Sequence, residues 1–372
     1  MIEFVIHGSH DYYLDVNDTC LYLKLKLTKP TANAPANAYF FENLPIASMF
    51  SKANLYLNDT LVETTQSNYA FKGMLFSLLQ FSPDVKKSHM RAWGYEEDDN
   101  ERKNWMKADS FEIEFMGPLF FDFFMQPQLL IPKVDIRIQL FSNPASFFMR
   151  SAAADTITWP IEIESTLLRV KRVRVNPAIL DAHAQGLMKR NAIYPITRTL
   201  MLSLPVNKDA TSFSYDNLFR GYSPKCLMVA MVAEESLTDA TKNPFKFENF
   251  KLNYFSILKD GVHVPHQRAL TPNFEKDLYM NEYVSMNQAV QLFLQNQTNG
   301  ITFADFKDKK CIFVCNLCGD YDLKNVQPQQ SSNLRIEMKF ATALTKNINI
   351  QLFALCVDRI EFDQELRAIC TS

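Results

Sequence analysis

The sequence predicts an all-β protein that is divided into two tandem antiparallel domains. Its 30 Phe and 14 Tyr against only 9 Gly favour strands, because aromatic side chains suit the half-buried surface of a sheet. Segments that alternate polar and apolar residues recur in both halves, and short motifs of the first half return in the second. At roughly 100–200 residues per domain, 372 residues suffice for two domains, which we predict to be 1–155 and 156–372.

Alternation with a period of two locates the predicted strands, because it gives each strand one wet face and one buried face. Along the first part of the chain these are residues 20–27, 53–64, 111–115, 132–141 and 167–175. Further along they are residues 199–204, 225–232, 251–258, 311–317, 333–342 and 347–357. We therefore expect antiparallel sheets in both domains.

Helical signals are few, and they lie between the predicted strands. The candidates are residues 44–50, 69–79 and 177–190. Before the third of these, Asn176 is a favourable N-cap, and Pro177 stands at the first helical position, where its fixed φ suits a helix. Each domain is expected to carry short helical insertions.

Three motifs recur in the same order in the two halves. Residues 41–44 (FENL) match 215–218 (YDNL), residues 57–62 match 258–262, and residues 136–140 (IRIQL) match 334–338 (LRIEM). In the second match, Asp59 and the Asp260-Gly261 pair supply the chemistry of a tight hairpin turn. The order of the matches indicates one β domain present twice.

A duplicated β domain of this size fits an eight-stranded jelly roll, in which two sheets wrap on each other. An immunoglobulin-type sandwich is shorter and normally shows a Cys…Trp…Cys spacing, which the sequence lacks. The predicted architecture is therefore two tandem eight-stranded antiparallel jelly rolls, a double jelly roll.

Several longer stretches carry a resemblance to a known family. They are residues 3–9 (EFVIHGS), 11–15 (DYYLD), 21–27 (LYLKLKL), 50–59 (FSKANLYLND) and 68–73 (NYAFKG), then 216–221 (DNLFRG), 243–250 (NPFKFENF) and 272–275 (PNFE). Over nearly its whole length the chain resembles the hexon-like major capsid proteins of the adintoviruses and of the related Polinton (Maverick) elements.

The resemblance implies a structural protein of the virion capsid. Three copies would form a pseudo-hexagonal capsomer, or hexon, with the double jelly roll upright in an icosahedral shell. The implied partners are further copies of the chain, neighbouring capsomers, and penton and minor capsid proteins. The resemblance implies no cofactor and no catalysis. It also implies that the protein is made in the host cytoplasm, and one place where the capsid could assemble is the nucleus.

Composition and motifs exclude several other functions. Lys plus Arg number 39 against 41 Asp plus Glu, so no broad basic field exists to bind nucleic acid directly. The first residues do not form a signal peptide, and no apolar run approaches the ~18 residues of a spanning helix; an internal membrane beneath the shell stays open. No nucleophile elbow, phosphate-binding loop, dinucleotide fingerprint or zincin helix occurs. We expect no enzyme and assign no catalytic, cofactor-binding or metal-binding residue.

Two groups of residues resemble metal ligands. Cys311, Cys315 and Cys318 form C-x3-C-x2-C, but a fourth ligand at the usual spacing is missing and the segment is expected to be a strand that runs into a turn at Gly319-Asp320. The pairs His7/His10 and His263/His266 lack carboxylates at helical spacing. We predict no metal at either place, and free thiols for all seven Cys.

Three surface features could mediate contacts between subunits. The charged run 96–103 between Trp93 and Trp105 is expected to be a solvated loop, or a surface for salt bridges between subunits. The cations of residues 169–174 (RVKRVR) are expected to share one strand face. The aromatic clusters 120–124 and 147–149 should fill the core, and any exposed member would mark a trimer interface.

Two other functions compete with the capsid role. A jelly-roll module that binds carbohydrate or a receptor would need aromatic and carboxylate residues at exposed loop tips. A metalloenzyme of the cupin type would need a His-x-His motif, which is absent.

Overall fold

The computed structural model describes residues 1–28, 39–105, 110–151, 161–265, 267–292, 296–318 and 331–370. The chain forms two compact units. The first comprises Met1–Leu75, Asp84–Thr197 and Asp358–Ser372, and the second comprises Phe76–Pro83 and Arg198–Val357. The predicted domain boundary between residues 155 and 156 falls outside the described residues and stays a prediction.

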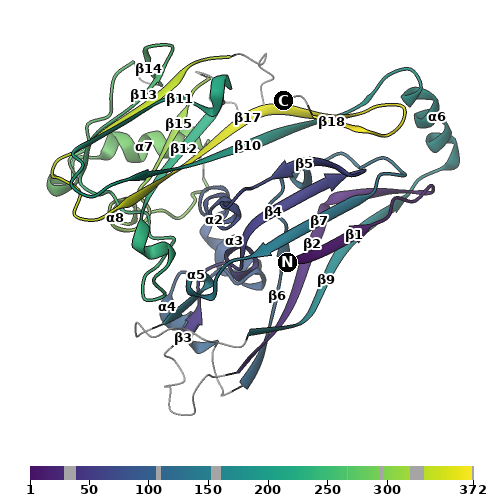
Figure 1. Cartoon of the computed structure of the whole chain (residues 1–372), viewed down its shortest axis with the longest axis horizontal. Coiled ribbons are helices and arrows are strands. Elements are labelled where there is room, and N and C mark those ends of the chain that lie inside the picture. Colours follow the sequence, from purple (N-terminus) through teal and green to yellow (C-terminus); the bar gives the residue numbers. More distant parts are fainter. Residues whose placement is uncertain are drawn as a thin grey trace. The chain divides into compact units, whose positions relative to one another are not determined.

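Two antiparallel sheets and a short strand pair form the first unit (Figure 1). The sheets have the strand orders β1-β7-β4-β5 and β6-β2-β9, and β3 pairs with β8. The strands are β1 (Ile2–Ile6), β2 (Tyr12–Thr28), β3 (Tyr39–Phe41), β4 (Phe50–Leu57), β5 (Thr60–Thr64), β6 (Ser110–Pro118), β7 (Ile136–Ser142), β8 (Met149–Ser151) and β9 (Ile161–Arg174).

The core of the first unit lies on the apolar faces of its two sheets. In β2, Leu21, Leu23, Leu25 and Leu27 are fully buried, as are the alternate residues Ile136, Ile138 and Leu140 of β7. Full burial of one such side chain contributes roughly 1.5–3 kcal/mol. The intervening residues of β2, such as Lys24, face outward, which confirms the prediction made from period-two alternation.

The second unit is built on two further antiparallel sheets, although residues 192–197, 358–362 and 368–370 of their strands belong to the first unit. Their strand orders are β10-β17-β12-β15, where β18 also pairs with β17, and β11-β16-β13-β14. The strands are β10 (Ala192–Val206), β11 (Ser212–Leu218), β12 (Cys226–Ala233), β13 (Leu252–Lys259), β14 (Val262–Val264), β15 (Ile312–Asn316), β16 (Leu334–Phe340), β17 (Ile348–Phe362) and β18 (Ala368–Cys370). Every residue of β12 and β15 is buried.

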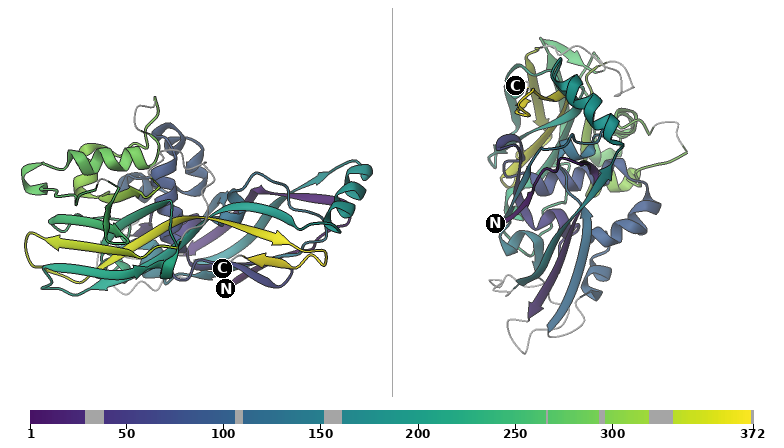
Figure 2. Two further views of the ribbon diagram at one scale, coloured as in Figure 1. Left: turned by 90° about the horizontal axis from the view of Figure 1, so that it is seen from above. Right: turned by 90° about the vertical axis from the view of Figure 1, so that its right-hand side faces the viewer.

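Helices connect the strands and cover parts of the sheets (Figure 2). They are α1 (Pro45–Ser48), α2 (Tyr69–Gln80), α3 (Pro83–Lys87), α4 (Asp99–Asn104), α5 (Ala145–Phe148), α6 (Pro177–Leu187), α7 (Met280–Ala289) and α8 (Phe303–Asp308), with short 3-10 turns between them. Helix α7 packs on β15. Helix α6 begins as predicted, because the Asn176 side chain accepts a hydrogen bond from the backbone N–H of Ala178 at 3.0 Å. It connects the end of β9 to the start of β10 (Figure 1).

The two units repeat the same strand pairings. The order β1-β7-β4-β5 corresponds to β11-β16-β13-β14, and β9-β2-β6 corresponds to β17-β12-β15. The second predicted match is confirmed, because the hairpins β4–β5 and β13–β14 are equivalent, and so is the third, because β7 is equivalent to β16. These pairings indicate one jelly-roll unit present twice.

The first predicted match is wrong. Residues 41–44 precede β4, whereas residues 215–218 end β11 and precede β12. In the repeated pairing, β4 corresponds to β13 and not to β12. The shared letters therefore arise from similar local sequence at non-equivalent places.

Candidate functional site

The charged run 96–103 is partly buried, in contrast to the prediction of a solvated loop. Helix α4 begins in this run, where the Asp98 side chain accepts a hydrogen bond from the backbone N–H of Asn100 at 2.8 Å. Arg102 lies one turn further on, and its side chain is only 1% exposed. An arginine is buried here because Glu42, which follows β3, is also fully buried and supplies the opposite charge.

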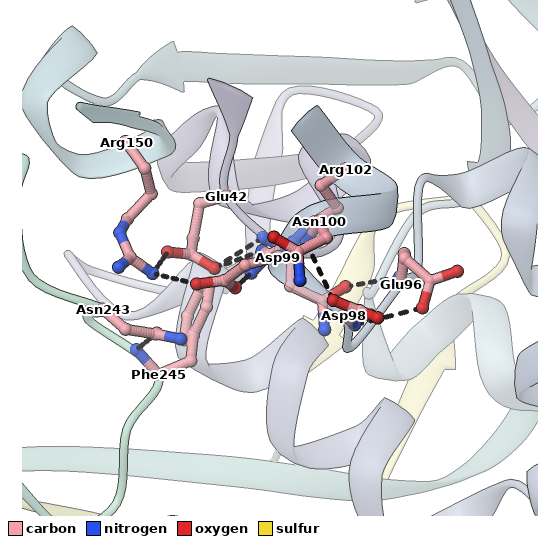
Figure 3. A network of polar contacts seen from close by, with 10 residues as sticks. Glu42, Glu96, Asp98, Asp99, Asn100, Arg102, Arg150, Asn243 and Phe245 are labelled. Atoms are coloured by element: carbon pink, nitrogen blue, oxygen red, sulfur yellow. Dashed lines mark hydrogen bonds and ion pairs between the residues drawn. The ribbon is translucent and has the colours of Figure 1, made fainter. Parts of the chain in front are cut away.

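Arg102 is the centre of an ionic cluster with Glu42, Asp99 and Arg150 (Figure 3), in which Arg102 and Glu42 are buried and the Asp99 side chain is 42% exposed. Its guanidinium lies 2.5 Å from one Glu42 oxygen and also contacts Asp99. Arg150 of β8 lies 3.3 Å from the other Glu42 oxygen and 3.7 Å from Asp99. The ring of Phe40 lies within 5.5 Å of both guanidinium groups, a distance suited to cation–π attraction.

The pKa of Arg102 shows how strongly the cluster holds its charges. Burial acts to lower this pKa, but the Glu42 and Asp99 carboxylates outweigh burial and raise it. The cluster joins α4, the β3–β8 pair and Glu42, which lies between β3 and α1. These contacts hold the segments together.

A second buried ionic group lies elsewhere in the first unit. The Lys72 ammonium of α2 lies 2.8 Å from Glu63 and 2.7 Å from Asp122. Glu63 also accepts hydrogen bonds from the backbone N–H of Asp122 and Phe123. Burial and the neighbouring Asp122 carboxylate raise the pKa of Glu63. The group ties α2 and β5 to the aromatic segment that contains Phe123.

The basic segment of β9 does not have its four cations on one face, which corrects the prediction. Side chains of a strand alternate between faces, so Arg169 and Lys171 lie on one face while Arg172 and Arg174 lie on the other. All four are exposed. Lys171 pairs with Asp15 at 3.0 Å and with Asp18 at 3.2 Å on the neighbouring strand.

The aromatic clusters lie in the core. Phe120, Phe121, Phe123 and Phe124 are at most 3% exposed, and Phe147, Phe148 and Met149 are also buried. They therefore do not mark an exposed interface. The large apolar side chains that are exposed lie elsewhere, including Leu167 on β9 and Leu278 and Met280 in the second unit.

The cysteine and histidine motifs have local roles in the structure. Cys311 and Cys315 are buried, and burial raises the pKa of Cys315 to about 12. His263 contacts the Ser256 hydroxyl at 2.6 Å and His7 approaches Asp135 at 3.7 Å. His266 and Gly319-Asp320 lie outside the described residues.

The described residues contain neither a cluster of metal ligands nor a membrane-spanning helix. In the ranges that the structure describes, no group of three or more His, Cys, Asp or Glu residues is arranged to hold a metal ion. Within those same ranges, no helix has both the length and the apolar character needed to span a membrane.

Comparison of the sequence with known proteins gives one distant relative. No family model matches the chain. The uncharacterized protein F54H12.2 of Caenorhabditis elegans is 19% identical over 325 residues, which cover 82% of this chain and 77% of the worm protein.

Comparison of the structure gives several viral capsid proteins. The chain is similar to the capsid protein of the PBCV-1 virus, with a TM-score of 0.60, 11% identity, and coverage of 100% of this chain and 96% of the other. A protein of the Sputnik virophage matches with a TM-score of 0.59 and 11% identity over 99% of this chain and 85% of the other. The mavirus major capsid protein matches with a TM-score of 0.53 and 11% identity over 99% and 86%.

These similarities, together with the repeated strand order, show that the chain has the double jelly-roll fold. The predicted fold class is confirmed: a mostly antiparallel β protein of two jelly rolls with short helical insertions.

Proposed function

We propose that this chain is a major capsid protein that forms homotrimeric, pseudo-hexagonal capsomers and tiles an icosahedral shell. The observation that carries the proposal is the match to the PBCV-1 capsid protein, which extends over 100% of this chain and 96% of the other. A match over the whole length of both chains includes both jelly rolls and the order in which they are joined.

The duplication of the unit supports this role by geometry. A trimer of a chain with two equivalent units presents six similar sides, and such an object packs in a hexagonal lattice. Closed symmetry makes each contact repeat around the threefold axis. A tandem repeat thus explains how three copies of one chain, each with two equivalent units, can form a capsomer with six similar sides.

The buried ionic clusters support a rigid structural role. Each removes several charges from water and pairs them, an arrangement that strongly resists loss of either partner. Arg102 and Lys72 both hold helical insertions against strands. A shell subunit needs such fixed insertions, because its outer and lateral surfaces must be the same in every copy.

The origin and partners complete the proposal. The sequence motifs in both halves support membership of the adintovirus and Polinton group, and the partners would be copies of the chain, penton proteins and minor capsid proteins. The place of action would be the virion capsid, and the role would be structural, without catalysis or a cofactor.

The experiment that tests the role is light scattering during size exclusion, followed by negative-stain imaging of the same peak. We expect a mass near three times 42.9 kDa and particles with hexagonal outlines. A species that stays monomeric across a wide concentration series would contradict the proposal.

A further inference from the structure

In both units, a buried charged residue lies near the start of the helix that follows the repeated hairpin. Helix α2 follows the β4–β5 hairpin, and α7 follows the equivalent β13–β14 hairpin. Each helix starts at or beside a buried tyrosine, Tyr69 or Tyr279. Three positions after the tyrosine, Lys72 is buried in the first unit and Glu282 in the second. The two units therefore bury charges of opposite sign at corresponding places.

The two buried charges differ in their partners. Lys72 lies 2.8 Å from Glu63 and 2.7 Å from Asp122. Glu282 is only 4% exposed, and among the residues that the structure describes it forms no ion pair. A buried carboxylate without a partner is strongly unfavourable, so such a group tends to take up a proton. Glu282 is therefore best accommodated in its neutral form.

The charges around Glu282 do not compensate for its burial. Arg268, in the segment between β14 and α7, is exposed and acts on Glu282 without reaching ion-pair distance. The Cys311 thiol, which precedes β15, stays neutral because burial raises its pKa. Burial raises the pKa of Glu282, and the hydrogen bond from its own backbone N–H and the charge of Arg268 do not outweigh this effect. The charged residues of α8 and of the two positions after it act electrostatically on Tyr279 or on one another; they are Asp305, Lys307, Asp308, Lys309 and Lys310.

The two ends of α7 are held with different strength. The helix packs on β15, and Met286 and Ala289 in its second half are buried. At its start, Met280 is 59% exposed, and the N-cap residue Tyr279 provides no side-chain cap. The first turn is held instead by the Tyr279 ring, which stacks on Phe303 at 4.1 Å between ring centroids. Movement of the first turn therefore disturbs fewer buried contacts than movement of the second half.

We propose that the first turn of α7 is a proton-controlled latch, which lies against the second unit while Glu282 is protonated and opens to water when Glu282 is ionised. Because the pKa of Glu282 is raised above 4.5 in the closed form, the closed form binds the proton more tightly than the open form. This stabilisation is complete below the pKa of an exposed Glu and is lost as pH rises through the raised pKa. The proposal goes beyond the capsid role and does not depend on it.

Hydrogen exchange followed by mass spectrometry tests the latch on the purified full chain, from mildly acidic to mildly alkaline pH. Protection is expressed relative to the intrinsic exchange rate at each pH, which removes the direct effect of pH on exchange. We expect protection of residues 280–283, the first turn of α7, to decrease as pH rises. The decrease should be about tenfold for each unit by which the pKa is raised. Strand β12, which is buried throughout, should stay protected at every pH.

Substitutions identify the group that titrates. Glu282→Gln and Glu282→Met cannot ionise, so protection of the first turn should no longer change with pH in either variant. A general destabilisation by either substitution would lower protection equally at every pH, so the slope is the quantity compared. Arg268→Gln removes the nearby cation and should extend the decrease to higher pH. Glu275→Gln changes an acid that is 67% exposed before the same helix, and it should behave like the unchanged protein.

Two results would overturn the proposal. One is the same pH dependence of first-turn protection in the unchanged protein and in Glu282→Gln. The other is a loss of protection in β12 that equals the loss in α7, since this would show unfolding of the unit and not opening of one turn. Trimer formation is measured separately by mass, so failure of the capsid role and failure of the latch are distinguishable.

Discussion

Asn58 and Asp135 bind each other through both backbone and side chain. The Asn58 N–H donates to the Asp135 carbonyl at 3.0 Å, and the Asp135 N–H donates to the Asn58 side-chain oxygen at 2.7 Å. In the second unit, Asp260 and Asn333 form the same pair at 2.9 Å for both bonds. Each pair joins the first turn residue of a hairpin to the residue that precedes a central strand.

The amide and the carboxylate side chains occupy opposite positions in the two pairs. The turn residue is Asn58 in one unit and Asp260 in the other, and its partner changes from Asp135 to Asn333. Both residue types supply the required acceptor oxygen, and both tolerate the left-handed backbone that a tight turn needs. Asn58 has φ 44° and Asp260 has φ 51°. The geometry of the repeat is therefore retained although the letters differ.

Loss of the turn side chain should destabilise either unit. We expect Asn58→Ala and Asp260→Ala each to lower the free energy of unfolding by about 1–2 kcal/mol, because each removes a hydrogen bond and places Ala in a left-handed conformation. Urea unfolding measures the change. Asp260→Asn keeps the acceptor and is the control; an equal loss in this variant would contradict the explanation.

Removal of one partner from the buried ionic cluster should have a larger effect. Arg102→Met leaves the Glu42 charge buried with less compensation, and we expect a loss of about 3–5 kcal/mol. The double variant Arg102→Met/Glu42→Leu should lose less than the sum of the single changes. Chemical unfolding of all three variants tests this, with the exposed Arg367→Met as a control that should change little.

Glu63 should make stability depend on pH. Burial and the Asp122 carboxylate raise its pKa above 4.5 in the folded state, so the folded protein binds a proton more tightly than the unfolded chain. The stabilisation is present below the unfolded pKa and is lost as pH rises through the folded pKa. Unfolding of the wild type relative to Glu63→Gln, followed from acid to neutral pH, should show this decrease; a flat difference would contradict it.

Thiol reactivity should follow burial. Cys226, Cys311, Cys315 and Cys356 are buried, whereas Cys20, Cys318 and Cys370 are partly accessible. We expect alkylation of the native protein near neutral pH to modify only Cys20, Cys318 and Cys370. After unfolding, all seven Cys should be modified. Mass spectrometry of digested protein locates the labels. Rapid native labelling of Cys315 would contradict the buried environment.

Much of the fold could be predicted because its signals are local. The predicted strand at residues 132–141 corresponds to β7, and the predicted helix at residues 69–79 corresponds to α2. Strand β1 was not predicted, because Glu3 is the one polar residue in its sequence IEFVI and an alternation of polar and apolar residues is not distinct there. The face of each β9 cation was mispredicted, although strict alternation of side chains would have separated them.

The sequence by itself determined the class of the fold, the hairpin turns and the duplication, because alternation and turn chemistry act over a few neighbouring residues. Only the tertiary structure decided that Arg102 meets Glu42, which is 60 positions away in the chain, and that β17 has a neighbour on its outer side whereas β9 has none among the described strands. Buried charge pairs and strand edges depend on contacts between distant segments, and those contacts exist only after the chain has folded.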